Sequence, residues 1–386
     1  MTAPRPEPVK VMAPASLRRR GAGALYGYWH PTSAAANILA CGAPPARPRS
    51  APPVELLGWI GPRPAGRPAG EPGLSGTRDE QGRLEFALGN REVAVDYYQL
   101  HQDLFSRNTG ILESERMASR RAILVGCGSV GSLAALELAR AGVGGFLLVD
   151  QDRLHYHNLC RHQCGISDVG RYKGEALADR IREINPEAVV AVENRVIQRV
   201  PKEVFDRWAG AKSIFLGSGD NREADLYANR VACLYRVPLV SVGLWERAFA
   251  GEVFYTIPGE MPCYKCYCET IGFTEAVINQ NRRFYTTRED LAEVNFEPGI
   301  STDLSFVTLV AVKLVYDLLT RREEGVHSKV LHDLAQLTLV CNSTDPAVGG
   351  EMSYLFSHAL QVTRSLVVER LEGCPHCRIV GKALGE

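Results

Sequence analysis

A glycine-rich stretch and the acidic residue that follows it are the first groups in the sequence suited to binding a ligand. Residues 122–131 form an apolar run that leads into the spacing G-x-G-x-x-G, with Gly126, Gly128 and Gly131 as the three glycines. Such a turn lets the backbone approach an anion closely, and N–H groups at the start of the next helix face that anion. Asp150 follows the next apolar run, where a carboxylate can accept hydrogen bonds from ribose hydroxyls. Together these residues predict a nucleotide site, although the turn alone does not distinguish a dinucleotide from ATP.

Four cysteines form a second group with a recognisable chemistry. Cys263 and Cys266 make one Cys-x-x-Cys pair, and Cys374 and Cys377 make another. Each pair can give two thiolates to one tetrahedral ion, so the spacing predicts a structural zinc site. His376 lies inside the second pair and is expected not to be a ligand. The chain has 11 cysteines, an odd number that cannot all pair within one chain, which favours a reducing cytoplasm.

Further polar residues follow the glycine turn in a fixed order. The sequence has D-x-D at 150–152, N-L-x-R at 158–161, G-x-x-K at 170–173 and x-D-N at 219–221. Together with the glycine turn, these patterns resemble the ThiF/MoeB/HesA family of adenylating enzymes, whose eukaryotic members activate ubiquitin and its relatives. The resemblance covers about residues 107–380.

This resemblance implies a role for each polar residue. ATP, rather than NAD, occupies the glycine turn, and a carboxylate attacks the α-phosphate so that pyrophosphate leaves. An attack of one anion on another requires cations, for which Arg161 and Lys173 are the candidates. Asp220 suits Mg²⁺, a hard cation with oxygen ligands, and Asp150 holds the ribose. The remaining implied residues are Asp152 near the phosphates or the metal, and Asn158 and Asn221 in the polar network around them.

Two further predictions also depend on the resemblance. Arg107, in the run Leu-Phe-Ser-Arg-Asn, is similar to an arginine that reaches the ATP of the other subunit in this family, which implies a homodimer with shared sites. An ordinary surface arginine is the alternative.

Some relatives also transfer the acyl group to a cysteine. The chain lacks a cysteine in the run Val-Asn-Phe-Glu-Pro-Gly at 294–299, where sulfur-carrier activators have one, and Cys268 is the remaining candidate. A reactive thiol needs a lowered pKa, which a sequence does not reveal. Cys268 could therefore equally be a spare thiol of the zinc knot. The polar segment 268–298 is expected to be an exposed loop that crosses over a bound polypeptide tail, or else a solvated excursion.

Hydrophobic periodicity predicts the elements that must position these residues. From Arg121 onward, short apolar runs without alternation are typical of buried parallel strands, and helical segments separate them. This order predicts an α/β fold with a Rossmann-like, doubly wound and mostly parallel sheet over residues 101–386, extended by C-terminal antiparallel strands and a four-cysteine zinc knot. The predicted strands are Ala122–Val125, Phe146–Val149, Val189–Val192, Ile214–Leu216 and Leu239–Val242, and the predicted helices are Ser132–Ala141, Lys173–Ile184, Arg222–Arg236 and Asp303–Arg321.

The N-terminal region differs in composition from the rest. Residues 1–80 hold 14 of the 22 prolines, with ten basic and five acidic residues. Proline removes a backbone donor and restricts its predecessor, so much of this stretch cannot be helical. Residues 1–100 are therefore expected to be partly disordered or to form a small accessory domain of unknown role. Its apolar islands are Ala24–Trp29, Val54–Ile60, Leu84–Leu88 and Val93–Leu100.

Overall composition excludes several classes of protein. The hydrophobic fraction is 45% and the charged fraction 23%, which is typical of a globular protein. The 44 basic and 44 acidic residues cancel, so nucleic acid is not expected as a partner. The longest apolar stretch, residues 306–319, contains Lys313 and Asp317, and no secretory signal is recognisable. We expect a cytoplasmic protein without a membrane anchor.

These observations and the resemblance predict an ATP-dependent activating enzyme that uses Mg²⁺ and contains Zn²⁺. Its substrate is the C-terminal glycine carboxylate of a ubiquitin-like or sulfur-carrier protein, and thioester transfer to a cysteine stays open. One alternative is a ThiF-like enzyme for a small-molecule or tRNA-linked carboxylate, against which the four cysteines argue. Another is a non-catalytic adaptor for a ubiquitin-like protein, against which Arg161, Lys173 and Asp220 argue. An NAD oxidoreductase is the weakest alternative, because no hydride-accepting residues follow the turn.

The bias toward proline, arginine and alanine indicates a bacterial source with a GC-rich genome. A conjugating enzyme is a further candidate partner, and a conjugation operon used in antiviral defence is one hypothesis for the pathway.

Overall fold

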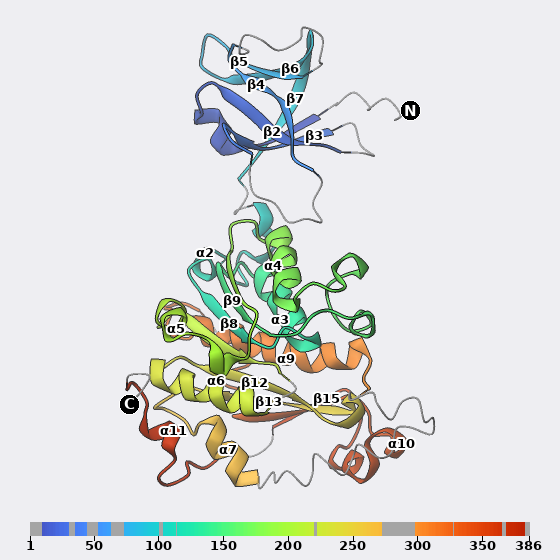
Figure 1. Ribbon diagram of the computed structural model, residues 1–386, viewed down its shortest axis with the longest axis vertical. Coiled ribbons are helices and arrows are strands. Elements are labelled where there is room, and N and C mark those ends of the chain that lie inside the picture. The colour runs from blue at the N-terminus through green and yellow to red at the C-terminus, as the bar shows by residue number, and fades with distance from the viewer. Residues whose placement is uncertain are drawn as a thin grey trace. The chain divides into compact units, whose positions relative to one another are not determined.

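The computed structural model describes residues 10–30, 35–44, 53–62, 73–99, 103–112, 114–219, 222–271, 298–326, 328–364 and 368–382. The chain divides into two compact units, Met1–Thr109 and Gly110–Glu386 (Figure 1). Within the described ranges, no helix combines the length and the apolar character needed to cross a membrane.

The first unit is a closed β-barrel, drawn in blue and cyan in Figure 1. Its strands follow the order β1-β3-β2-β4-β5-β6-β7, and β1 pairs in parallel with β7 to close the barrel. The short helix η1 (Ala15–Arg19) follows β1. The strands are β1 Lys10–Pro14, β2 Gly23–Trp29, β3 Ala35–Cys41, β4 Glu55–Ile60, β5 Leu74–Arg78, β6 Leu84–Leu88 and β7 Arg91–Tyr98.

Alternate residues of these strands fill the interior of the barrel. Val11 and Ala13 of β1 are fully buried, as are Leu25 of β2 and Phe86 of β6, so each strand gives one face to the core. A β-carbon on Gly58 would lie 1.7 Å from the carbonyl oxygen of Leu74, so the pairing of β4 with β5 requires glycine there. The four apolar islands of the sequence coincide with β2, β4, β6 and β7.

The second unit is built on an eight-stranded sheet with the order β10-β9-β8-β11-β12-β13-β14-β15. The pairs from β10 to β12 are parallel, and those from β12 to β15 are antiparallel. The strands are β8 Arg121–Val125, β9 Gly145–Val149, β10 Val189–Glu193, β11 Ser213–Gly217, β12 Leu239–Leu244, β13 Ala250–Thr256, β14 Leu337–Cys341 and β15 Gln361–Arg364. The mixed α/β fold with a parallel sheet predicted from the sequence is confirmed.

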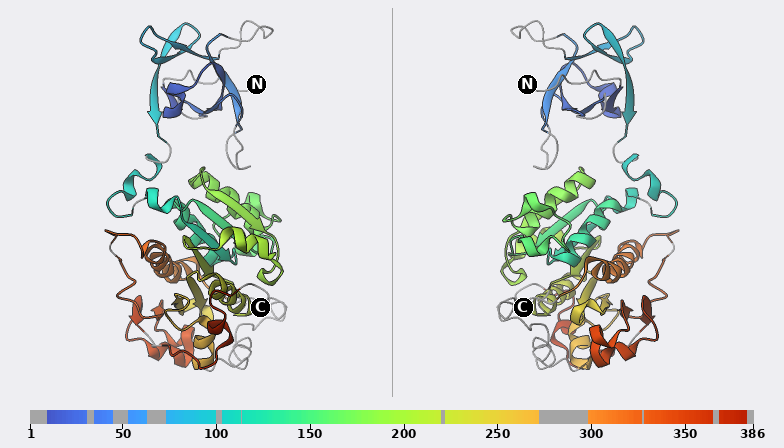
Figure 2. Two further views of the ribbon diagram at one scale, coloured as in Figure 1. Left: turned by 90° about the vertical axis from the view of Figure 1, so that its left-hand side faces the viewer. Right: turned by 90° about the vertical axis from the view of Figure 1, so that its right-hand side faces the viewer.

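Helices cover both faces of this sheet, as Figure 2 shows from two sides. Ala122 and Leu124 of β8 pack in one apolar cluster with α3, α4 and α9, whereas Ile123 and Val125 pack on the opposite face with α5, α6 and α7. Burial of both faces explains why the parallel strands are continuously apolar. The longer helices are α3 Ser129–Arg140, α4 Lys173–Ile184, α5 Lys202–Trp208, α6 Arg222–Tyr235, α7 Tyr264–Ile271 and α9 Ser301–Thr320.

Short helical turns complete the described part of the chain. They are η2 Ser106–Asn108, α2 Ser114–Met117, η3 Tyr156–Asn158, η4 Ile166–Asp168, η5 Ile197–Arg199, η6 Glu246–Ala248, α10 Pro346–Gly349, η9 Gly350–Leu355 and α11 Pro375–Arg378. The loop expected over residues 268–298 begins inside helix α7, and its residues 272–297 lie outside the described ranges.

Candidate nucleotide site and cysteine cluster

The glycine turn connects β8 to α3 at the carboxyl edge of the parallel strands. Gly126 has a φ of +97°, and a β-carbon there would lie 2.9 Å from the backbone of Ser218. A β-carbon on Gly131 would lie 2.1 Å from the carbonyl oxygen of Gly126. At Gly128, the N-cap of α3, a β-carbon would meet no protein atom within 4 Å. Two glycines therefore serve the packing of the turn itself, whereas the third faces open space, as a phosphate site at a helix start requires.

Asp150 ties this turn to the residues after β9. Its Oδ2 accepts a hydrogen bond from the backbone N–H of Cys127 at 2.7 Å, and its Oδ1 accepts one from Asp152 at 2.7 Å. Burial raises the pKa of Asp150, and the two backbone donors act in the opposite direction. Each carboxylate oxygen has a second lone pair, so the geometry fits the predicted contact with ribose hydroxyls.

Lys173 lies at the start of α4 and meets the same segment. Its Nζ is 3.0 Å from Oδ2 of Asp152, and its backbone N–H donates to the carbonyl oxygen of Asp152 at 2.9 Å. The side chain of Lys173 is 13% exposed and that of Asp152 is 58% exposed, so the lysine is held from the protein side while the carboxylate faces outward. The structure thus brings together two predicted site residues that are 21 positions apart.

The N-L-x-R segment lies beside the turn. The side-chain oxygen of Asn158 accepts a hydrogen bond from the backbone N–H of His155 at 2.9 Å, which caps η3. A guanidinium nitrogen of Arg161 lies 3.9 Å from the position of a β-carbon on Gly299, just before α9. The side chain of Arg161 therefore reaches the segment just before the amino end of α9.

His162 is a member of the site that sequence reasoning did not select. It is buried, and its Nε2 lies 2.7 Å from the carbonyl oxygen of Cys127. Its Nδ1 accepts a hydrogen bond from the backbone N–H of Cys164 at 3.0 Å. Burial lowers the pKa of His162. The one signal in the sequence was that this histidine follows Arg161, and a lone histidine is not evidence for a contact with a distant turn.

Three predicted residues take no part in these contacts. Asp220 and Asn221 lie outside the described residues, directly after Ser218 and Gly219. The hydroxyl of Ser218 donates to the carbonyl oxygen of Gly126 at 2.9 Å, so this segment runs beside the turn. Arg107 is exposed in η2, within the first unit, and its action on a partner subunit stays a prediction.

The two Cys-x-x-Cys pairs, which are far apart in the sequence, meet in one cluster. The sulfur atoms of Cys263, Cys266, Cys374 and Cys377 all lie within 4.8 Å of one another. The Cys263–Cys374 and Cys266–Cys377 sulfur distances are 3.5 and 3.7 Å. Zinc–sulfur bonds of about 2.3 Å in a tetrahedron place the sulfurs about 3.8 Å apart, so the cluster fits a zinc ion. The backbone N–H of Leu371 donates to the sulfur of Cys266 at 3.3 Å, as expected around a thiolate.

His376 has a partner away from the four sulfurs. Its Nδ1 lies 2.8 Å from the side-chain nitrogen of Asn229 on α6, and the side-chain oxygen of Asn229 accepts from the backbone N–H of Tyr264 at 2.9 Å. His376 thus helps to join α11 to α6 and α7 and is not among the clustered ligands.

Cys268 lies in α7, where it packs against the apolar cluster on that face of the sheet. Burial raises the pKa of its thiol to about 11, so little thiolate is present at neutral pH in this arrangement.

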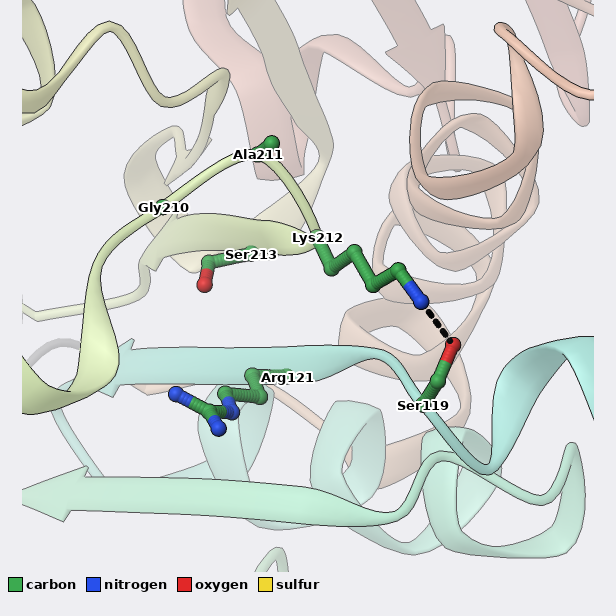
Figure 3. A pocket seen from close by; sticks show the side chains of 6 residues that line it. All are labelled: Ser119, Arg121, Gly210, Ala211, Lys212 and Ser213. Carbon is green, nitrogen blue, oxygen red and sulfur yellow. Dashed lines mark hydrogen bonds between the residues drawn. The ribbon is translucent and has the colours of Figure 1, made fainter.

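A small pocket of about 210 Å³ lies elsewhere, at the amino ends of β8 and β11 (Figure 3). Lys212 and Ser119 span it with a hydrogen bond of 3.2 Å. Because parallel strands bind ligands at their carboxyl ends, this pocket is not part of the candidate site. Its lining residues are Ser119, Arg121, Gly210, Ala211, Lys212 and Ser213.

Comparisons with known proteins show the family of the chain. Residues 101–345 match the ThiF family. The chain is 29% identical over 199 residues to a sulfur carrier protein ThiS adenylyltransferase of Bacillus subtilis, covering 48% of this chain and 57% of that protein. It is 33% identical over 174 residues to a SAMP-activating enzyme E1 of Haloferax volcanii, covering 45% and 61%.

A ubiquitin-like modifier-activating enzyme 5 of Culex quinquefasciatus is 29% identical over 209 residues, covering 51% of each chain. The chain thus spans between 51% and 61% of the length of these relatives. Among solved structures, Escherichia coli MccB with MccA-N7isoASN superposes with a TM-score of 0.51 at 16% identity, covering 72% of this chain and 74% of that one, which supports the fold.

Proposed function

Because the chain belongs to the ThiF family, we propose that it uses ATP to adenylate the C-terminal carboxylate of a ubiquitin-like or sulfur-carrier protein. The observation that carries the proposal is a chain of contacts of 2.7 to 3.0 Å that leads from the glycine turn through Asp150 and Asp152 to Lys173. The names of three relatives, which include a modifier-activating enzyme and a carrier-protein adenylyltransferase, support the substrate class.

The proposed reaction joins two anions. The triphosphate lies along the start of α3, with the ribose hydroxyls donating to Asp150. A carboxylate oxygen of the carrier protein attacks the α-phosphorus, the bond from that phosphorus to the bridging oxygen breaks, and pyrophosphate leaves with the electron pair. Lys173 and Arg161 reduce the repulsion between the negative oxygens in the transition state.

The other predicted residues have supporting roles in this proposal. Asp220 would hold Mg²⁺, which neutralises phosphate oxygens, and Asn158 and Asn221 would complete the polar surroundings. Arg107 would act on the site of a second copy, so that the protein is a homodimer. A tail that ends in glycine fits best, because only a residue without a β-carbon passes close to a backbone-lined channel. A conjugating enzyme would be the next partner.

Transfer of the acyl group to a thiol is a separable second step. Cys268 would attack the acyl carbon and release AMP, but its raised pKa requires that α7 first expose this thiol or that a cation approach it. The four clustered cysteines would hold Zn²⁺ as a structural ion that fixes the C-terminal segment to the sheet.

The test is ATP–pyrophosphate exchange with ubiquitin-like or sulfur-carrier proteins encoded near the gene, alongside intact-protein mass spectrometry. We expect exchange that depends on the carrier and is lost when its final glycine is removed. Lys173→Met should lower the exchange rate by about 10²-fold or more, since it removes a cation aimed at developing charge. Lys212→Met is the matched control, because Lys212 lies at the opposite edge of the sheet.

The outcomes separate the alternatives. Exchange without any carrier protein would favour a small-molecule carboxylate. An absence of exchange with every carrier, in a protein that is folded and binds ATP, would contradict the proposal. A reductant-sensitive adduct that is lost in Cys268→Ala would add the thioester step.

A further inference from the structure

The peptide groups on both sides of Cys127 are held by two polar side chains, the half-buried Asp150 and the buried His162. The N–H of Cys127 donates to Asp150 at 2.7 Å, and its carbonyl oxygen lies 2.7 Å from Nε2 of His162. His162 is 7% exposed and comes from the segment directly after Arg161. Two separate parts of the chain therefore hold the middle of the glycine turn, one through the carboxylate of Asp150 and the other through the imidazole of His162.

The protonation of His162 follows from its two partners. Nδ1 accepts the N–H of Cys164, so Nδ1 carries no proton. The proton of the neutral ring is then on Nε2, which donates to the carbonyl oxygen of Cys127. A second proton on Nδ1 would face the N–H donor of Cys164 and remove that hydrogen bond, so this arrangement exists only with neutral imidazole.

This contact determines where the next backbone donor points. In a trans peptide the C=O and N–H groups are directed to opposite sides. Because His162 holds the carbonyl of Cys127, the N–H of Gly128 points away from His162. Gly128 is also the position where an added β-carbon would meet no protein atom within 4 Å. The imidazole thus orients a backbone donor toward the open side of the turn.

We propose that His162 is a positioning residue that presets the glycine turn for an anionic ligand and makes the affinity for nucleotide sensitive to acid. The inference rests on the proposed function only in taking that ligand to be ATP. It also joins the orientation of the turn to the segment that carries Arg161, since one short stretch of chain provides both.

The charged groups around the ring act in both directions. Burial and Lys173, at the start of α4, lower the pKa of His162, whereas the carbonyl of Cys127 and Asp168, in η4, raise it. The net direction is downward, so the neutral ring persists below the usual histidine pKa of about 6.5. As the pH falls through the lowered pKa, Nδ1 gains the second proton and the hydrogen bond from Cys164 is lost. The ring is then no longer fixed on its Nδ1 side, and its hold on the carbonyl of Cys127 shifts with it.

The experiment measures the Kd of Mg-ATP for the full chain by calorimetry at about pH 8 and then at steps below the usual histidine pKa of about 6.5, down to the lowest pH at which the chain stays folded. His162→Gln keeps a neutral donor and an acceptor, and His162→Leu keeps neither. His157→Leu, an exposed histidine of the same segment, is the matched control. Unfolding by urea at pH 8 reports whether each variant is folded.

At the higher pH we expect His162→Gln and His157→Leu to bind within about threefold of the wild type, and His162→Leu to bind about tenfold more weakly, as loss of one buried hydrogen bond predicts. On acidification the wild type should weaken relative to His162→Gln. The ratio of the two Kd values removes the titration of ATP itself.

Equal affinities of the wild type and a folded His162→Leu would overturn the inference while leaving the proposed function intact. If the affinities of the wild type and His162→Gln change in parallel with pH, the acid sensitivity is overturned. If His162→Leu does not fold, this comparison of pH dependences is the one that tests the inference. Failure of the wild type to bind ATP would overturn the proposed function and this inference with it.

Discussion

The candidate nucleotide site, here called the nucleotide edge and made of the glycine turn, Asp150, Asp152, His162 and Lys173, and the cysteine cluster are assembled in different ways. At the edge, Asp150, His162 and Lys173 bind backbone groups of the turn and of its neighbouring segment, so the chain itself supplies every partner. In the cluster, four thiols face one another at sulfur distances that suit an ion between them. The first region is organised without a ligand, whereas the second would be complete only with a metal. The two regions should therefore respond to different perturbations.

Removal of the metal should give the largest effect. We expect Cys374→Ser with Cys377→Ser to destabilise the second unit by about 4 kcal/mol or more, because two ligands of a structural ion are lost. Thermal unfolding with and without a chelator measures this effect, and elemental analysis gives the zinc content. Cys160→Ser, at an exposed cysteine, should change neither. A purified protein that contains no zinc and whose thermal unfolding is unaffected by the chelator would contradict the statement that the cysteine cluster needs a metal.

The next effect separates two glycines of the same turn. Gly131→Ala should cost about 3 kcal/mol, because its β-carbon would lie 2.1 Å from a backbone oxygen. Gly128→Ala should cost about 1 kcal/mol or less, as for an N-cap substitution, yet should weaken ATP binding strongly since the methyl group projects into the open side of the turn. Urea unfolding and calorimetry measure the two quantities. Equal losses of stability in both variants would contradict the assignment of Gly128 to ligand contact.

Asp150→Asn should separate affinity from stability. Burial raises the pKa of Asp150, so the folded chain holds this proton more tightly than the unfolded chain, and the carboxyl stabilises the fold less as pH rises through its pKa. The amide NH₂ would face one of the two backbone donors, and loss of the charge offsets part of that cost, so the free energy of unfolding at neutral pH should fall by about 2 kcal/mol or less. ATP affinity should fall about tenfold, because an amide is a poorer acceptor for ribose hydroxyls. A large loss of stability with unchanged affinity would reverse this assignment.

The smallest effect concerns Cys268, which lies three residues from the end of α7. Its thiol should react slowly with iodoacetamide at neutral pH, and the rate should rise as the pH approaches about 11. Peptide mapping by mass spectrometry can compare it with exposed Cys160 in the same sample. Faster alkylation of Cys268 than of Cys160 at neutral pH would show that the thiol is activated.

The proximity of the glycine turn, Asp150, Asp152 and Lys173 could be predicted from the sequence because it depends on short spacings. The glycine turn, Asp150 and Lys173 each stand at a junction between a predicted strand and helix, and parallel strands bring such junctions to one edge. The helix Lys173–Ile184 has the predicted bounds, and α9 begins two residues before the predicted start.

Other features depend on contacts that no local pattern contains. His162 reaches the turn from 35 residues away, and its role follows from burial rather than from its neighbours in the sequence. In the first unit, β1 pairs with β7, which closes a barrel that the proline-rich composition did not indicate. Cys268 is two residues beyond a zinc-site cysteine, and its spacing gave no sign that it belongs to a helix packed on the core.

The cysteine cluster also changes the topology of the chain. Cys263 and Cys374 are 111 residues apart, and the segment between them includes α9, β14 and β15. A metal bound to both pairs makes that segment a closed ring even after the sheet has come apart. Closing a loop of this length removes conformational entropy from the unfolded chain, with an upper value of about 4 to 5 kcal/mol by analogy with disulfides. A bound ion would therefore protect the second unit by limiting what its unfolded chain can explore.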